Sequence, residues 1–229
     1  MKCLSLLTVL ISFISFAQIG QFAIVNDADG FSNIRSSAEI NKENIIEKLD
    51  NGTLVFVFDI EGNWCDIDYD KNGFQNGYIY KNRILFVEDY PKIDRLSETK
   101  TTITFKKNNI EINIIQEKFN QNKHKLTFDK REGWLKEING KPFFGTDGNI
   151  PKTQYQSIKI KINNKNIDLP KTAFYDLFEP NWYHTKVNYD EKNDVLYLHS
   201  FNSDGAGGYA VIWKIEKGKY KDRLVVYGF

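Results

Sequence analysis

Hydrophobic and polar residues alternate over much of this chain with the period of two that is typical of β-strands. The clearest case is residues 158–162, where isoleucine and lysine alternate and give one apolar and one basic face. Similar runs of β-branched and aromatic residues occupy positions 53–58, 63–68, 101–105, 110–115, 195–199, 209–215 and 224–227. We therefore predict a mainly β protein in which these strands are half exposed.

Turn signals separate the strands and divide the chain into two β-rich parts. Asn-Gly pairs at 51–52, 72–73, 76–77 and 139–140 tolerate positive φ, and the polar segments 191–194 and 216–219 predict hairpins in an antiparallel meander. A polar stretch at 88–98 predicts a linker between an N-terminal domain, residues 20–87, and a β-rich C-terminal domain, residues 99–229. One short helix is predicted at 171–178, between Pro170 and Pro180.

The N-terminus has the pattern of an export signal. Lys2 precedes an apolar run at 4–16, and Ser15 and Ala17 fit the small-x-small rule for cleavage after Ala17. The run is shorter than the ~20 residues that a membrane-spanning helix needs. We predict an exported protein, periplasmic or extracellular, with residues 1–17 removed and no membrane span after cleavage.

Charge and cysteine content narrow the function classes. The chain has 229 residues, 31 basic and 30 acidic side chains, and a formal net charge of +1. Cleavage removes 17 residues and one lysine, which leaves 212 residues with no net charge and argues against a nucleic-acid partner. Cleavage also removes Cys3, so no internal disulfide is expected, and Cys65 is predicted to be a buried apolar side chain.

Residues 23–84 resemble the bacterial SH3-like (SH3b) domain family. The resemblance rests on four segments in the family's order: 30–36, which includes the Asn-Ile-Arg-Ser step, 51–57, 62–64 with its Gly-x-Trp strand start, and the closing 77–84. Where the family often has Gly-Pro after the Arg-Ser step, this chain has Ser36, Ser37 and Ala38. The resemblance implies a small SH3-like barrel of five to six strands. Such domains are usually exported and bind peptidoglycan peptides or glycans, or act as spacers.

Four residues of this part are candidate binding residues. Trp64, Tyr78 and Tyr80 are large amphipathic side chains, and Tyr78 and Tyr80 share a strand face. Packing in the barrel is the alternative role for each of the three. Arg35 is predicted either to bind a ligand carboxylate in a bidentate manner or to pair with a nearby aspartate.

The C-terminal part resembles uncharacterised exported bacterial β domains in three short segments, 139–148, 178–181 and 202–209, and this resemblance implies no activity. A Cys-His peptidase would need a nucleophile here, but the one mature cysteine lies in the SH3-like part. The chain has no Gly-x-Ser-x-Gly or His-Glu-x-x-His motif, and its three histidines are widely spaced. We predict no catalytic residue, no metal site and no cofactor.

Two clusters in the C-terminal part supply the remaining binding candidates. Trp182 and His184 belong to an aromatic segment around Pro180, whose alternative role is to pack against the meander. Asn202 and Asp204 lead into a glycine-rich loop, where binding residues tend to lie.

Together these observations predict an exported, non-enzymatic binding protein that contacts cell-wall peptide or glycan, or an envelope protein. Two alternatives remain open. One is an inhibitor or immunity protein that blocks a periplasmic toxin or wall hydrolase. The other is a hydrolase with catalytic acids in the C-terminal domain, because 30 acidic residues offer many possible pairs.

Overall fold

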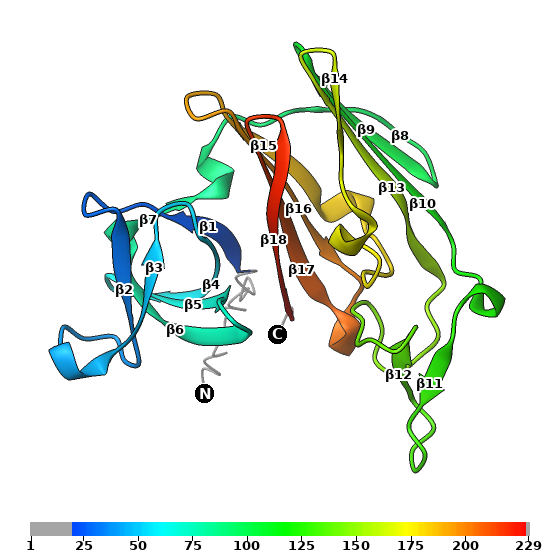
Figure 1. The fold of residues 1–229 in the computed structure, drawn as a ribbon, viewed down its shortest axis with the longest axis horizontal. Helices are drawn as coiled ribbons and strands as arrows, with labels where there is room; N and C mark the ends of the chain where they lie inside the picture. Colours follow the sequence, from blue (N-terminus) through cyan, green and yellow to red (C-terminus); the bar gives the residue numbers. More distant parts are fainter. Residues whose placement is uncertain (1–19, 228–229) are drawn as a thin grey trace, which may run out of the picture.

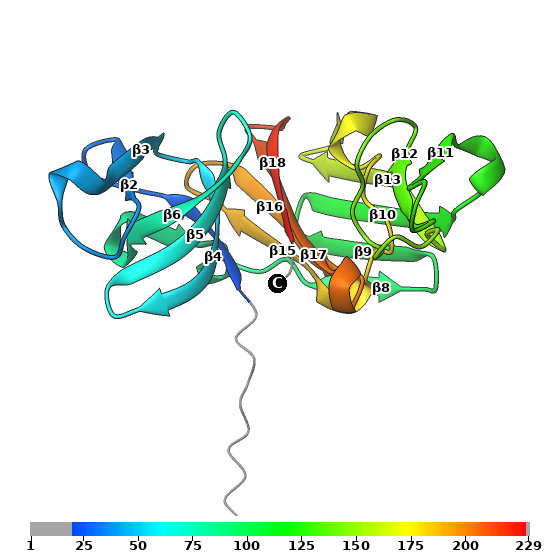
Figure 2. The same cartoon turned by 90° about the horizontal axis from the view of Figure 1, so that it is seen from below.

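The computed structural model describes residues 20–227, in which three β-sheets lie side by side as layers (Figures 1 and 2). The predicted signal peptide and its cleavage site after Ala17 lie outside the described residues. The prediction of a mainly β protein is confirmed, because every pair of named strands within residues 20–227 is antiparallel and no α-helix occurs among them. None of the helical turns in this range has the length and hydropathy of a membrane span.

The first layer is a seven-stranded sheet that curls strongly around its own core (Figure 1). Its strands are β1 (Gln21–Val25), β2 (Phe31–Arg35), β3 (Ile45–Asp50), β4 (Leu54–Glu61), β5 (Trp64–Asp70), β6 (Phe74–Tyr80) and β7 (Ile84–Phe86), in the order β3-β2-β6-β5-β4-β1-β7. No ladder joins β3 to β7, so the sheet is not closed into a barrel, and it has seven strands where five to six were expected. The core contains Ile34, Ile67, Ile79 and Cys65, which is buried and free as predicted.

The outer layer is a five-stranded sheet with a small hairpin beside it. Its strands are β8 (Arg95–Glu98), β9 (Thr102–Lys107), β10 (Ile110–Lys118), β13 (Thr153–Ile162) and β14 (Lys165–Asp168), in the order β14-β13-β10-β9-β8. The predicted alternation in β13 is confirmed, because Ile158, Ile160 and Ile162 are buried while Lys159 and Lys161 are exposed. The separate hairpin consists of β11 (Leu126–Phe128) and β12 (Leu135–Ile138).

The middle layer is the predicted meander, formed by β15 (Thr185–Asp190), β16 (Val195–Asn202), β17 (Tyr209–Glu216) and β18 (Lys219–Tyr227). The prediction that these strands are half exposed is wrong for β16 and β17, whose side chains are buried almost without interruption. The reason is that both faces are covered: Tyr197 and Ile212 pack with Phe56 of the first layer, whereas Leu198 and Trp213 pack with the outer sheet. A hydrophobic core therefore joins the N-terminal and C-terminal parts.

Residues 88–98, the predicted linker, are paired with both sheets of the C-terminal part. Val187 O accepts a hydrogen bond from Ile93 N at 2.9 Å, and Pro91 O accepts one from Tyr189 N at 2.9 Å, so this segment extends the edge of β15. A few residues later the chain forms β8 at the edge of the outer sheet. The segment thus connects the middle layer to the outer layer through main-chain hydrogen bonds.

The predicted helix at 171–178 is wrong. Only a 3₁₀ turn, η5 (Lys171–Ala173), forms there. Ala173, Phe174, Leu177 and Phe178 are buried with the spacing of a helix face, but the backbone leaves the helical path after the turn. Leu177 and Phe178 instead form β-bridges with Phe144 and Gln154, and these long-range bridges take the place of helical hydrogen bonds.

Candidate functional site

A groove on the first layer, here called the N-terminal groove, brings together three of the predicted binding residues. Arg35, Trp64 and Tyr80 line this open groove, whose volume is about 370 Å³. Trp64 and Tyr80 are directly opposite each other on β5 and β6, and their rings meet edge to face with centroids 5.1 Å apart. The pair forms an aromatic wall of the groove that Arg35 also lines.

The strand pleat explains why these aromatic side chains are available. Cys65 and Ile79 point into the core, so their sequence neighbours Trp64 and Tyr80 lie on the opposite, partly exposed face. Tyr78 is on this face too, but it pairs with Arg35 across the β2–β6 ladder and does not line the groove. Trp64 and Tyr80 therefore lie outside the core, where a ligand can reach them.

Within the described residues Arg35 does not pair with an aspartate, which was one of the two roles predicted for it. Its Nη1 donates to Asn44 Oδ1 at 2.7 Å and to Asn41 O, which ties the guanidinium to the turn that precedes β3. The Arg-Asp pair of the groove is formed by Arg83 and Asp27 instead, and Asp27 is almost buried. Arg83 belongs to the segment that resembles the SH3-like family, but its pairing across 56 positions could not be seen in the sequence.

A larger opening, here called the C-terminal cleft, lies at the end of the middle and outer layers. It is open, its volume is about 1170 Å³, and it is formed by residues from positions 128–133, 145–152, 179–183 and 203–207, together with Glu98. Trp182 and Asp204 line it as predicted binding residues, beside Tyr183. All three short segments that resemble exported bacterial β domains contribute to its wall.

Asn202 does not line this cleft, but it is hydrogen-bonded to Asn181, which does. Its side chain is buried, and Oδ1 accepts hydrogen bonds from Asn181 N at 2.9 Å and Ser200 Oγ at 2.7 Å. Its Nδ2 donates to the hydroxyl of Tyr155 at 3.0 Å. Asn202 is thus a positioning residue that holds the segment containing Asn181, Trp182 and Tyr183.

His184 is the fourth candidate of this part, and it lies outside the lining of the cleft. Its ring stands edge-on to that of Tyr183, with centroids 4.9 Å apart.

Glu179, the acidic residue nearest to His184 in the sequence, is part of the cleft wall. It accepts hydrogen bonds from the backbone N–H groups of Lys152 and Thr153 and from the Thr153 hydroxyl. These donors engage both oxygens of Glu179, so the carboxylate holds the backbone of the cleft wall.

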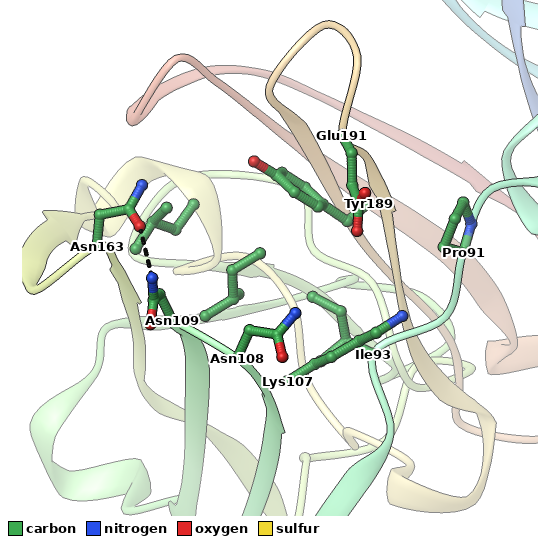
Figure 3. A pocket seen from close by; sticks show the side chains of 10 residues that line it. Pro91, Ile93, Lys107, Asn108, Asn109, Asn163, Tyr189 and Glu191 are labelled. Atoms are coloured by element: carbon green, nitrogen blue, oxygen red, sulfur yellow. Dashed lines mark hydrogen bonds between the residues drawn. The ribbon is translucent and has the colours of Figure 1, made fainter.

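A third cavity lies between the outer sheet and β15, and it is shown in Figure 3. Asn108, Asn109 and Asn163 come from the turns at the end of the outer sheet, and Tyr189 closes the opposite side. Asn109 Nδ2 donates to Asn163 Oδ1 at 3.2 Å. The volume of about 140 Å³ is below the 300–1000 Å³ range of small-molecule sites, so we do not treat it as the candidate site.

In the described part of the chain, histidine and acidic side chains do not gather in the way that a metal ion requires. Within residues 20–227, no group of three or more His, Cys, Asp or Glu side chains is placed to hold one. His199 is fully buried next to Asn188, whose Oδ1 lies 3.0 Å from Nε2, and burial lowers the pKa of this histidine to about 4. His199 therefore serves the packing of the middle layer.

We compared the chain with protein-family models, curated proteins and solved structures. Nothing in these three comparisons matches it.

Proposed function

We propose that this chain is an exported, non-enzymatic protein that binds cell-wall peptide or glycan at the envelope, and that its first layer is an SH3-like binding module. The proposal rests on the resemblance of residues 23–84 to bacterial SH3-like domains, on the export signal, and on one structural observation. That observation is the N-terminal groove, in which Arg35 lies beside the aromatic pair of Trp64 and Tyr80.

The hydrogen bonds of Arg35 give this groove a directional anion site. Both of them run from Nη1, so the edge formed by Nε and Nη2 has no partner within residues 20–227. That edge presents two parallel N–H donors, the arrangement that binds a carboxylate in a bidentate manner. Because Nη1 is anchored to Asn41 and Asn44, little side-chain entropy is lost when a ligand binds.

The aromatic wall supplies the second half of the recognition. Trp64 and Tyr80 offer rigid, partly apolar surfaces that bury ligand area at low entropic cost. A wall peptide has free carboxylates for the guanidinium and aliphatic stems for the rings, and a wall glycan has apolar sugar faces. With no net charge on the mature chain, such local contacts have to provide the affinity.

Co-sedimentation with insoluble peptidoglycan tests this proposal. The mature protein, residues 18–229, is expected in the pellet, and the double variant Trp64→Ala/Tyr80→Ala is expected to bind at least tenfold more weakly. Phe74→Ala is the matched control, because Phe74 is an exposed aromatic residue on β6 outside the groove. Wild-type protein that stays in the supernatant, or a double variant that binds like the control, would contradict the proposal.

A further inference from the structure

The C-terminal cleft has a chemistry of its own that the N-terminal groove does not share. It is formed by loops that come from four separate stretches of the chain, so its lining depends on how these loops hold one another. Two of them carry residues with positive φ that are not glycine, Glu179 at 53° and Ser203 at 62°. Such conformations persist only where the surroundings stabilise them, and they are frequent at functional sites.

Hydrogen bonds and close packing fix these loops to one another. Ser203 N donates to Glu179 O at 3.1 Å, and Ser203 Oγ donates to Gly145 O at 2.7 Å. A Cβ atom at Gly207 would lie 2.8 Å from Thr146 Cα, so only glycine permits this contact between two loops. The cleft is therefore preformed, and a ligand can bind without first ordering the loops.

The charged groups of the cleft are mostly acidic. Glu98 pairs with Arg95 and Glu179 is held by backbone donors, whereas Asp147 and Asp204 are exposed and make no side-chain hydrogen bond or ion pair within residues 20–227. Among the described residues that line the cleft, only Lys152 is basic. The two aspartates lie on the loops that Gly207 brings together, so their negative charge is concentrated on one side.

Aromatic side chains face the same opening. Tyr183 is 80% exposed and Phe128 is 44% exposed, and both line the cleft. The indole of Trp182 also lines it and is 7% exposed, but its Nε1 N–H has no acceptor within the described residues. Aromatic faces next to unpaired carboxylates attract ammonium and guanidinium groups, because both the ring quadrupole and the negative charge favour a cation.

We propose that the C-terminal cleft binds an extended basic segment of another protein, with its Lys or Arg side chains placed between Asp147, Asp204 and the ring of Tyr183. The cleft is open and its volume is about 1170 Å³, which suits a chain that lies across it. This site is independent of the N-terminal groove and takes a different ligand. The unpaired carboxylates favour a cationic peptide over a neutral glycan.

Isothermal titration calorimetry with synthetic peptides tests this site. The cationic probe is acetyl-Lys-Ala-Lys-Ala-Lys-amide, its matched control is the peptide with Glu at each Lys position, and chitotetraose is the neutral glycan. We expect the mature protein to bind the lysine peptide and not the other two, and we expect affinity to fall as salt is raised. Binding of chitotetraose alone, of both peptides equally, or of none of the three at millimolar concentration would overturn the proposal.

Variants then locate the binding. Asp147→Asn/Asp204→Asn and Tyr183→Ala are each expected to weaken binding of the lysine peptide at least tenfold. Asp89→Asn is the matched control, because Asp89 is an exposed acid on η3 (Val87–Asp89), outside the lining of the cleft. The Trp64→Ala/Tyr80→Ala variant of the N-terminal groove should bind the lysine peptide like wild type. A loss of binding at one site can therefore be distinguished from a loss of binding at the other. A double Asn variant that binds like Asp89→Asn would contradict the assignment.

Discussion

The backbone N–H of Asn181 donates a 2.9 Å hydrogen bond to Oδ1 of the buried Asn202, and this contact connects the core of the middle layer to the rim of the C-terminal cleft. Asn181 in turn fixes the next residues, because its own Oδ1 accepts a hydrogen bond from the backbone N–H of Tyr183 at 3.1 Å. This bond caps the 3₁₀ turn η6 (Trp182–His184). The position of the exposed Tyr183 ring thus depends on a buried side chain that does not line the cleft.

Replacing Asn202 with alanine should destabilise the protein strongly. The change leaves the hydroxyl of Tyr155 and the N–H of Asn181 without a partner, whereas the Ser200 hydroxyl keeps its contact with Thr185 Oγ1. Unsatisfied buried groups cost about 1–3 kcal/mol each. Allowing for relaxation, we expect the free energy of unfolding in urea to fall by about 3 kcal/mol. Asn149→Ala at the exposed rim should cost less than about 1 kcal/mol, and equal losses in the two variants would refute this role of Asn202.

The three layers should unfold as one unit, because the core that contains Phe56 and Ile212 joins the first layer to the middle layer. Truncating Ile212 to alanine should lower the free energy of unfolding by about 2–5 kcal/mol. In this variant the indole N–H signals of Trp64 and Trp213 in NMR spectra should disappear together, at one urea concentration that is lower than in wild type. A Trp64 signal that outlasts that of Trp213 would show that the first layer folds independently.

Stability should depend on pH through Asp68, a residue that is only 5% exposed. Burial raises its pKa to about 6, and the neighbouring charge of Asp66 acts in the same direction. In the unfolded chain the pKa is about 4, so between about pH 4 and 6 the folded state binds more protons and loses stability as pH rises. Asp68→Asn should therefore be more stable than wild type at pH 7, by up to about 3 kcal/mol, and close to it at pH 4.

The quantity to measure is the difference in free energy of unfolding between wild type and Asp68→Asn at each pH. The absolute stability also contains a contribution from buried His199, which changes with pH in the opposite direction. Its pKa is lowered to about 4, so its contribution to stability is complete above about pH 6.5 and is lost as pH falls toward 4. His199 is present in both proteins and cancels in the comparison. Asp59→Asn, an exposed acid on β4, should show no such pH-dependent difference. A gain for Asp68→Asn that does not vary with pH would contradict the shifted pKa.

The sequence predicts the strands well wherever one face is exposed. In β13 the isoleucine and lysine side chains alternate as the period-two pattern requires, and the meander β15–β18 follows the predicted hairpins. The same reasoning fails for β16 and β17, because their burial on both faces depends on two other layers that are distant in the sequence. It also fails at 171–178, where helix-like spacing is satisfied by bridges from Leu177 to Phe144 and from Phe178 to Gln154.

Individual residues of the candidate sites could be predicted from the sequence, but which residues come together in one site could not. Only Tyr78 and Tyr80 were predicted to share a strand face, whereas the pairing of Trp64 with Tyr80 depends on the register of the β5–β6 hairpin. The hydrogen bonds of Arg35 to Asn41 and Asn44 depend on the turn conformation, which the sequence does not show. The C-terminal cleft needs segments from positions 128 to 207 to converge, and no local pattern contains that information.

The central claim is that the N-terminal groove binds cell-wall material, and solution NMR with a soluble peptidoglycan fragment tests it most directly. We predict saturable shifts of the Trp64 indole N–H, the Arg35 guanidinium Nε–H and the Tyr80 backbone, with the indole signals of Trp134 and Trp213 unchanged. In the Trp64→Ala/Tyr80→Ala variant, the fragment should no longer shift the Arg35 signal, which is the one monitored groove signal that remains. A fragment that causes no shift at millimolar concentration, or shifts only signals outside the groove, would contradict the account.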